Sequence, residues 1–171
     1  MKFTYCPDCG EKLIDREIGD EGLVPFCEKC NRPWFPMFST CVIVLVATKD
    51  ENEVLLLRQN YISTRYFNLV SGYMKPGETA EETARREVQE EVGIELDSLE
   101  LVKTYWFEKK DMLMIGFIGK TEKTDVKLSG EVDGAKWFAP EEGINYVHPQ
   151  GSVSYALVEE FLRRKASQAQ R

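Results

Sequence analysis

The chain has 171 residues, of which 43% are apolar types and 11% are aromatic. This length and composition allow one domain of ordinary size with a small appendage, and they exclude disordered, collagen-like and low-complexity chains. Acidic residues outnumber basic ones by 29 to 22, which gives a formal net charge of −7. A field of that sign repels nucleic acid in bulk and anionic membranes, so neither is an expected partner.

No apolar run approaches the length of a membrane span, and the residues from Met1 to Cys6 lack the apolar core of a signal peptide. We therefore expect a cytoplasmic protein. In that reducing compartment, the five cysteines of the chain are more often metal ligands or buried thiols than disulfides.

Four of the five cysteines form two Cys-x-x-Cys pairs, Cys6 with Cys9 and Cys27 with Cys30. Each such turn directs two thiolates at one ion, and the doubled pattern is typical of a four-cysteine zinc site. Two disulfides or a redox-active pair are the alternatives. A reducing compartment disfavours disulfides, and the doubling disfavours a redox pair, which occurs once within a βαβ unit.

A segment of about 30 residues cannot bury enough apolar surface to fold unaided, so zinc is its expected main source of stability. We predict a zinc ribbon over residues 1–34 and a main domain over residues 35–171. The fifth cysteine, Cys41, lies in an apolar run of the main domain, which predicts a buried and unreactive thiol.

The hydrophobic pattern of the main domain predicts six strands and two helices. The strands are expected over residues 37–48, 54–57, 67–70, 99–107, 112–118 and 135–138. The first helix starts at Thr79, runs to about Val92 and is closed by Gly93, and either Ser152 or Ser154 caps the second. Strands with one mid-chain helix and one terminal helix indicate an α+β or α/β/α sandwich.

The first predicted helix carries Glu87, Glu90 and Glu91, whose i, i+3 and i+4 spacing brings their carboxylates together on one flank. Three neighbouring negative charges repel one another, and they are stabilised when a hard divalent cation such as Mg²⁺ lies among them. The alternative is a solvated acidic helix, which is common in a chain of this net charge.

Glycines on both sides of this helix favour a site. Gly72 ends a predicted strand, Gly77 lies in a Pro-Gly loop and Gly93 follows the helix, so the backbone geometry is fixed around the carboxylates. Arg86 on the same helix has three carboxylates within reach, namely Glu78, Glu82 and Glu90.

The segment Gly72-x5-Glu78-x7-Arg86-Glu87-x2-Glu90-Glu91-x-Gly93 resembles the Nudix hydrolase signature and matches it at every fixed position. With its flanking strands, the resemblance covers roughly residues 35–165. It implies an α+β fold, the Nudix α/β/α sandwich with a mixed sheet. It also implies Mg²⁺- or Mn²⁺-dependent hydrolysis of a nucleoside diphosphate linked to another moiety.

The resemblance also implies roles for single residues. The implied metal ligands are Glu87, Glu90, Glu91 and the backbone carbonyl of Gly72, and the implied orienting residues are Glu78 and Arg86. Nudix enzymes often place a further metal-binding or basic glutamate in a later loop, and Glu131 is the candidate here. In such enzymes the metal neutralises the diphosphate and lowers the pKa of a bound water, which attacks phosphorus.

A four-cysteine ribbon ahead of this domain resembles the NADH pyrophosphatase branch of the family. Residues 67–73 and 152–157 are similar to that branch, whereas Lys103-Thr104-Tyr105-Trp106 replaces its Ser-Gln-Pro-Trp motif and Lys75 replaces a usual glutamate. The resemblance implies an adenine dinucleotide such as NAD(H) as the substrate. ADP-ribose, FAD, dinucleoside polyphosphates and nucleoside triphosphates stay open.

Three aromatic residues are candidates for substrate binding: Phe67, Tyr105 and Trp106. Tyr105, Trp106 and Phe107 alternate along one strand, so they do not all face the same way. Tyr105 and Trp106 either pack in the core or stack on a base. The only histidine, His148, is expected to be a packing or surface residue and not a general base. A single histidine and the lack of a Gly-x-Ser-x-Gly motif also disfavour a serine hydrolase.

A second class of function stays open, in which the ribbon is an adaptor for nucleic acid or protein and the main domain binds a nucleotide without turnover. The negative charge and the complete set of glutamates favour an enzyme with a small nucleotide as its partner. Two roles of the ribbon remain alternatives, contact with the substrate and support of a homodimer.

Overall fold

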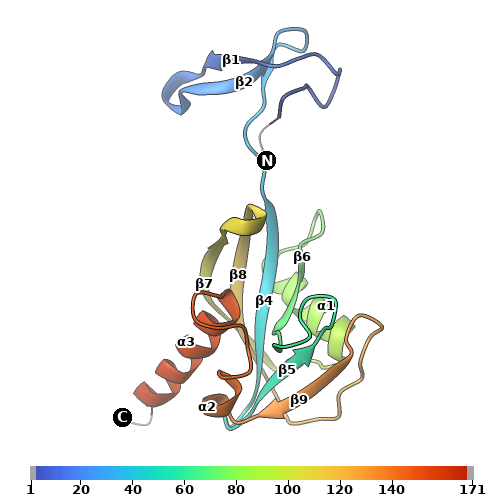
Figure 1. Ribbon diagram of the computed structural model, residues 1–171, viewed down its shortest axis with the longest axis vertical. Helices are drawn as coiled ribbons and strands as arrows, with labels where there is room; N and C mark the ends of the chain where they lie inside the picture. Colours follow the sequence, from blue (N-terminus) through green and yellow to red (C-terminus); the bar gives the residue numbers. More distant parts are fainter. Residues whose placement is uncertain (1–2, 169–171) are drawn as a thin grey trace. The chain divides into compact units, whose positions relative to one another are not determined.

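The computed structural model describes residues 3–168 (Figure 1). The chain divides between Ser39 and Thr40 into two compact units, whereas the sequence places the boundary between residues 34 and 35. Within the described residues, no helix is long and apolar enough to cross a membrane.

The first unit is a small antiparallel sheet with little interior. Its strands β1 (Ile14–Glu17), β2 (Leu23–Cys27) and β3 (Arg32–Pro33) follow the order β1-β2-β3. All of β1 is exposed, and the buried apolar residues of the unit are Cys6, Val24, Pro25, Phe26 and Cys27. The thiols therefore form a large share of what this unit buries.

The second unit is built on one sheet with the order β7-β8-β4-β5-β9, and β6 pairs with β4. The strands are β4 (Ser39–Thr48), β5 (Val54–Arg58), β6 (Val70–Tyr73), β7 (Ser98–Phe107), β8 (Met112–Thr121) and β9 (Gly134–Phe138). The N–H of Lys49 donates to the carbonyl of Thr121, so the ends of β4 and β8 coincide and these two strands run in the same direction (Figure 1). The other strand pairs are antiparallel, which confirms the predicted mixed sheet.

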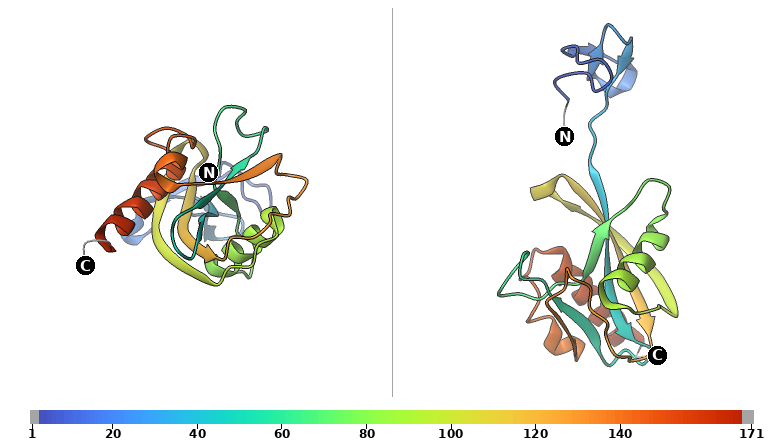
Figure 2. Two further views of the ribbon diagram at one scale, coloured as in Figure 1. Left: turned by 90° about the horizontal axis from the view of Figure 1, so that it is seen from below. Right: turned by 90° about the vertical axis from the view of Figure 1, so that its right-hand side faces the viewer.

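Helices cover both faces of this sheet (Figure 2). Helix α1 (Ala80–Val92) packs on one face together with Val42, Val44 and Val46 of β4. Helices α2 (Pro140–Gly143) and α3 (Val153–Gln168) cover the other face, where Ile43 and Leu45 pack against α3. Because β4 is buried on both sides, it is apolar without alternation. The predicted α/β/α sandwich is confirmed.

Two local predictions need correction. The strand expected over residues 67–70 begins only at Val70 and continues through Tyr73, because residues 70–73 pair with the first half of β4. Phe67 and Asn68 make isolated bridges instead. The short helix α2 was not predicted, and of the two predicted caps of α3 the structure selects Ser152, whose hydroxyl accepts from the N–H of Tyr155.

Candidate functional site

The four paired cysteines of the first unit lie together. Their sulfur atoms are all within 4.8 Å of one another, with 3.9 Å between Cys6 and Cys30 and 3.6 Å between Cys9 and Cys27. All four thiols are free, and no disulfide joins them in this structure. A zinc ion with Zn–S bonds of about 2.3 Å needs tetrahedral S···S edges of about 3.8 Å. The N–H of Cys30 also donates to the sulfur of Cys27 at 3.3 Å, which favours a thiolate there. The donor set and its spacing fit zinc.

Helix α1 is fixed at both ends. The hydroxyl of Thr79 accepts from the N–H of Glu82 at 3.2 Å, and the carboxylate of Glu82 accepts from the N–H of Thr79 at 2.8 Å. This reciprocal cap engages Glu82, so it is not the partner of Arg86. Gly93 ends the helix in the left-handed region with φ of 68°, where glycine is favoured.

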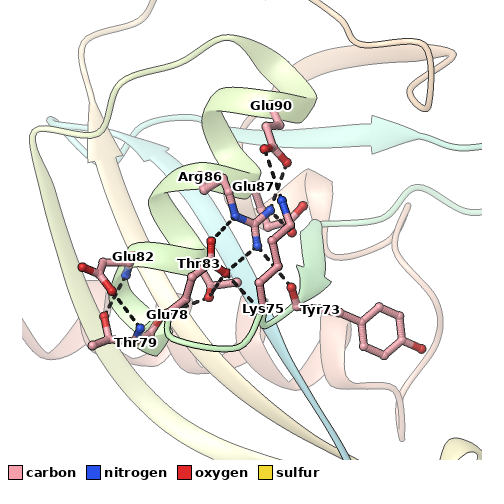
Figure 3. Close-up of polar contacts among 9 residues, drawn as sticks. All are labelled: Tyr73, Lys75, Glu78, Thr79, Glu82, Thr83, Arg86, Glu87 and Glu90. Atoms are coloured by element: carbon pink, nitrogen blue, oxygen red, sulfur yellow. Dashed lines mark hydrogen bonds and ion pairs between the residues drawn. The ribbon is translucent and has the colours of Figure 1, made fainter.

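Arg86 is the centre of an ion-pair network on the flank of α1 (Figure 3). Its Nε and Nη2 bond both oxygens of Glu78 at 2.6 and 2.8 Å, and its Nη1 bonds Glu87 at 2.6 Å and Glu90 at 2.9 Å. The guanidinium lowers the pKa of Glu78 to about 2. Two predicted partners of Arg86 are thus confirmed, and Glu87 is a further one.

Glu91 has a different environment, because only 4% of it is exposed. Its Oε1 accepts from Nε2 of Gln59 at 3.2 Å, while its Oε2 is buried without a partner. Burial and the charge of Glu87 raise the pKa of Glu91 to about 8. This oxygen is buried, has no donor and lies next to a second carboxylate. A cation bound there would stabilise the charged form of Glu91.

Gly72 of β6 lies against the carboxylate of Glu87 on the neighbouring helix α1. A Cβ atom at this position would lie 1.9 Å from the carboxyl carbon of Glu87. Only glycine therefore permits this approach of the strand backbone to the Glu87 side chain.

A cavity of about 1050 Å³ opens beside the flank of α1. Its carboxylate end is lined by Gly72, Arg86, Glu87, Glu90, Glu91 and Glu131. Its apolar lining includes Ile43, Leu69, Met112 and Met114, and residues 148–154, which lead into the start of α3, line it as well. This volume is at the upper end of the range for small-molecule sites, and it combines an acidic end with an apolar wall.

The three aromatic candidates lie outside the lining of this cavity. Burial, with a smaller contribution from the charge of Glu160 in α3, raises the pKa of Tyr105 to about 12, and Nζ of Lys103 lies 5.0 Å from the centroid of its ring. Phe67 packs edge-on against Phe138, with their ring centroids 5.4 Å apart. Trp106 is 53% exposed.

Phe107, which was not chosen from the sequence, does line the cavity. Alternation along β7 places it on the opposite face from Trp106.

Two other predicted residues also line the cavity. Cys41 is buried, which raises the pKa of its thiol to about 12, in agreement with the prediction of an unreactive side chain. His148 packs against the ring of Tyr66, with 4.9 Å between the ring centroids.

Lys75 lies 3.8 Å from Glu90, so the lysine that replaces the usual glutamate adds a positive charge at the acidic end of the cavity.

Sequence comparison relates the whole chain to longer proteins. It is 29% identical over 167 residues to the NAD-capped RNA hydrolase NudC of Pseudomonas aeruginosa, covering 97% of this chain and 58% of that protein. It is 26% identical over 178 residues to the human NAD-capped RNA hydrolase NUDT12, covering 95% of this chain and 38% of that protein. The chain therefore spans roughly half or less of the length of these relatives.

Solved structures share the fold. A NUDIX hydrolase from Nitrosomonas europaea matches with a TM-score of 0.72 and 22% identity, covering 96% of this chain and 93% of that chain. The NUDIX domain of Shewanella oneidensis NrtR, solved with ADP ribose, matches with a TM-score of 0.65 and 17% identity, covering 82% and 94%. The NUDIX domain model matches residues 37–158, which is more than half of the chain, and the protein therefore belongs to the NUDIX domain family.

Proposed function

We propose that this protein is a divalent-metal-dependent pyrophosphohydrolase that cleaves the diphosphate of a nucleotide conjugate, with NAD(H) or a related adenine dinucleotide as substrate. The convergence of Glu87, Glu90 and Glu91 at one end of the cavity carries the proposal. The relatives named as NAD-capped RNA hydrolases support the choice of an NAD-type substrate.

The carboxylates of Glu87, Glu90 and Glu91, with the carbonyl of Gly72, would hold Mg²⁺ or Mn²⁺. The partnerless oxygen of Glu91 and the close approach of Gly72 to Glu87 fit such an ion. When bound, the metal neutralises the diphosphate and lowers the pKa of a coordinated water.

The other residues of the network orient these ligands. Arg86 holds Glu87 and Glu90 in place, and the bidentate pair with Glu78 in turn fixes the plane of the guanidinium. Glu131 is exposed at the cavity, close enough to Glu91 to affect its pKa, and serves as a further ligand or as the proton acceptor from water.

In the first unit, Cys6, Cys9, Cys27 and Cys30 hold one zinc ion, whose role is structural. Four protein thiolates complete a tetrahedral shell and leave no position for a substrate, as in closed structural sites. The zinc ion therefore stabilises the fold of the ribbon and takes no direct part in hydrolysis.

Hydrolysis of a substrate panel with and without Mg²⁺ tests the proposal. NADH, ADP-ribose, FAD and a nucleoside triphosphate would be compared by kcat/KM, with the products identified by mass. We expect Mg²⁺-dependent cleavage with NADH among the better substrates. A preference for the triphosphate over every dinucleotide would contradict the substrate, and binding without turnover on the whole panel would contradict the enzyme.

A further inference from the structure

Gln59 is buried against the carboxylate end of the cavity. It follows β5 directly, and only 1% of it is exposed. Its Nε2 lies 3.2 Å from Oε1 of Glu91 and 3.4 Å from the hydroxyl of Tyr61. Burying an amide is costly unless it is hydrogen-bonded, and the contacts of Nε2 with Glu91 and Tyr61 compensate for part of that cost.

The Gln59–Glu91 pair still leaves two buried oxygens without a partner, Oε1 of Gln59 and Oε2 of Glu91. Each buried acceptor without a donor keeps the full cost of its desolvation. Among the described residues, what these two oxygens lack is a positive charge and a hydrogen-bond donor at bonding distance. A hydrated divalent cation supplies both, through the ion and through the O–H groups of its water.

The carboxylates of α1 are held by donors of two kinds. Arg86, on the helix itself, bonds Glu87 and Glu90, whereas Gln59 bonds Glu91 from the end of a sheet strand. A neutral amide fixes the orientation of a carboxylate without cancelling its charge.

We propose that Gln59 is a positioning residue for the active-site metal, because it holds Oε1 of Glu91 and leaves Oε2 for the divalent cation. The inference rests on one part of the proposed function, namely the assignment of Glu91 as a metal ligand. Outer partners of metal ligands contribute about 10–100-fold to metal affinity.

The test is Mn²⁺ binding to the full zinc-loaded chain, followed by electron paramagnetic resonance. Gln59→Met removes the amide at similar size, and Gln59→Asn keeps the amide but is one methylene too short to reach Glu91. We expect both variants to raise the Kd for Mn²⁺ by about tenfold or more. The matched control is Thr121→Val, which removes another buried polar group, one that donates to the carbonyl of Glu95 outside the cavity lining. It should bind Mn²⁺ with wild-type affinity.

Thermal unfolding without Mn²⁺ verifies that each variant is folded. In a Glu91→Gln background, Gln59→Met should weaken Mn²⁺ binding no further, because the residue acts through Glu91. Wild-type Mn²⁺ affinity in both Gln59 variants, or an additive loss in the double variant, would overturn the proposal. The titration needs no turnover, so a failure to hydrolyse any substrate would count against the proposed function and not against the role of Gln59.

Discussion

The two candidate metal sites of this protein differ in how much hydrophobic core surrounds them. In the first unit the buried thiols of Cys6 and Cys27 are part of the small interior, and the neighbouring strand β1 is wholly exposed. In the second unit the carboxylates lie beside a sheet with a hydrophobic cluster on each face. We therefore expect the first unit to need its metal in order to fold, and the second unit to fold without metal and to use it, under the proposed function, only for chemistry.

The largest expected effect is the loss of the first unit without zinc. Cys6→Ser removes one of four ligands, and structural zinc sites contribute folding free energy of about 10 kcal/mol or more. Hydrogen exchange should show lost protection in the first unit and unchanged protection in the second. The control Cys41→Ala should retain zinc. Purified wild-type protein without zinc would contradict the account.

The next effect concerns the carboxylates of α1. Glu90→Gln and Glu91→Gln should each lower kcat by about a thousand-fold, since several kcal/mol of metal-dependent stabilisation is lost. Thermal stability should be kept, because the two clusters of the second unit do not depend on a metal. Glu81→Gln, an exposed change on the same helix, should have no effect on rate. Normal rates in both site variants at saturating Mg²⁺ would refute the ligand assignment.

Gly72→Ala is expected to have a smaller effect on rate. The added methyl would collide with the carboxylate of Glu87, which must then move, and a displacement of about 1 Å in a site can cost about 100-fold in rate. Gly134→Ala is the matched control, because the nearest atom to its added methyl is 3.7 Å away. Equal kcat/KM values for the two variants would show that the approach of Gly72 to Glu87 is not required.

Replacing aromatic residues should affect substrate binding more than chemistry. Phe107 lines the cavity and Trp106 does not, so Phe107→Ala should raise the KM for NADH by about tenfold, the equivalent of a lost stacking contact. Trp106→Ala should raise it less. The reverse order of KM values would support the alternative, in which Trp106 stacks on a base.

The smallest effect is a pH dependence of stability from Glu78. Its pKa is lowered to about 2 by Arg86, from an ordinary value of 4.5, so the stabilisation is present above pH 4.5 and is lost as the pH falls toward 2. Glu78→Gln should lower the urea midpoint at neutral pH. The difference from wild type should shrink as the pH falls below about 5. A constant difference would show that the ion pair does not contribute through its charge.

The sequence predicted correctly those parts of the fold that neighbouring residues in the chain determine, such as the ends of a helix. Helix α1 begins and ends where Thr79 and Gly93 indicate, because a cap and a left-handed residue act within one turn. The limits of β6 were missed because its pairing depends on β4, about 30 residues away in the chain. Sequence could not show which half of the segment 67–73 would meet that partner.

The same distinction holds for the site. Glu87, Glu90 and Glu91 were predicted from helical spacing, and they do line one end of the cavity. Gln59 was missed, since a single polar residue after an apolar strand carries no signal until the helix is packed against it. Phe107 was missed because alternation shows that neighbours point to opposite faces without showing which face is the cavity.

The most direct test of the account is cleavage of NADH in water enriched in the heavy isotope of oxygen, with Mg²⁺ present. We predict two mononucleotide products, with one heavy oxygen on the phosphate of one of them and no reaction when Mg²⁺ is omitted. Cleavage that does not require a divalent metal, or products without the heavy oxygen on phosphorus, would contradict metal-dependent hydrolysis at the carboxylates of α1.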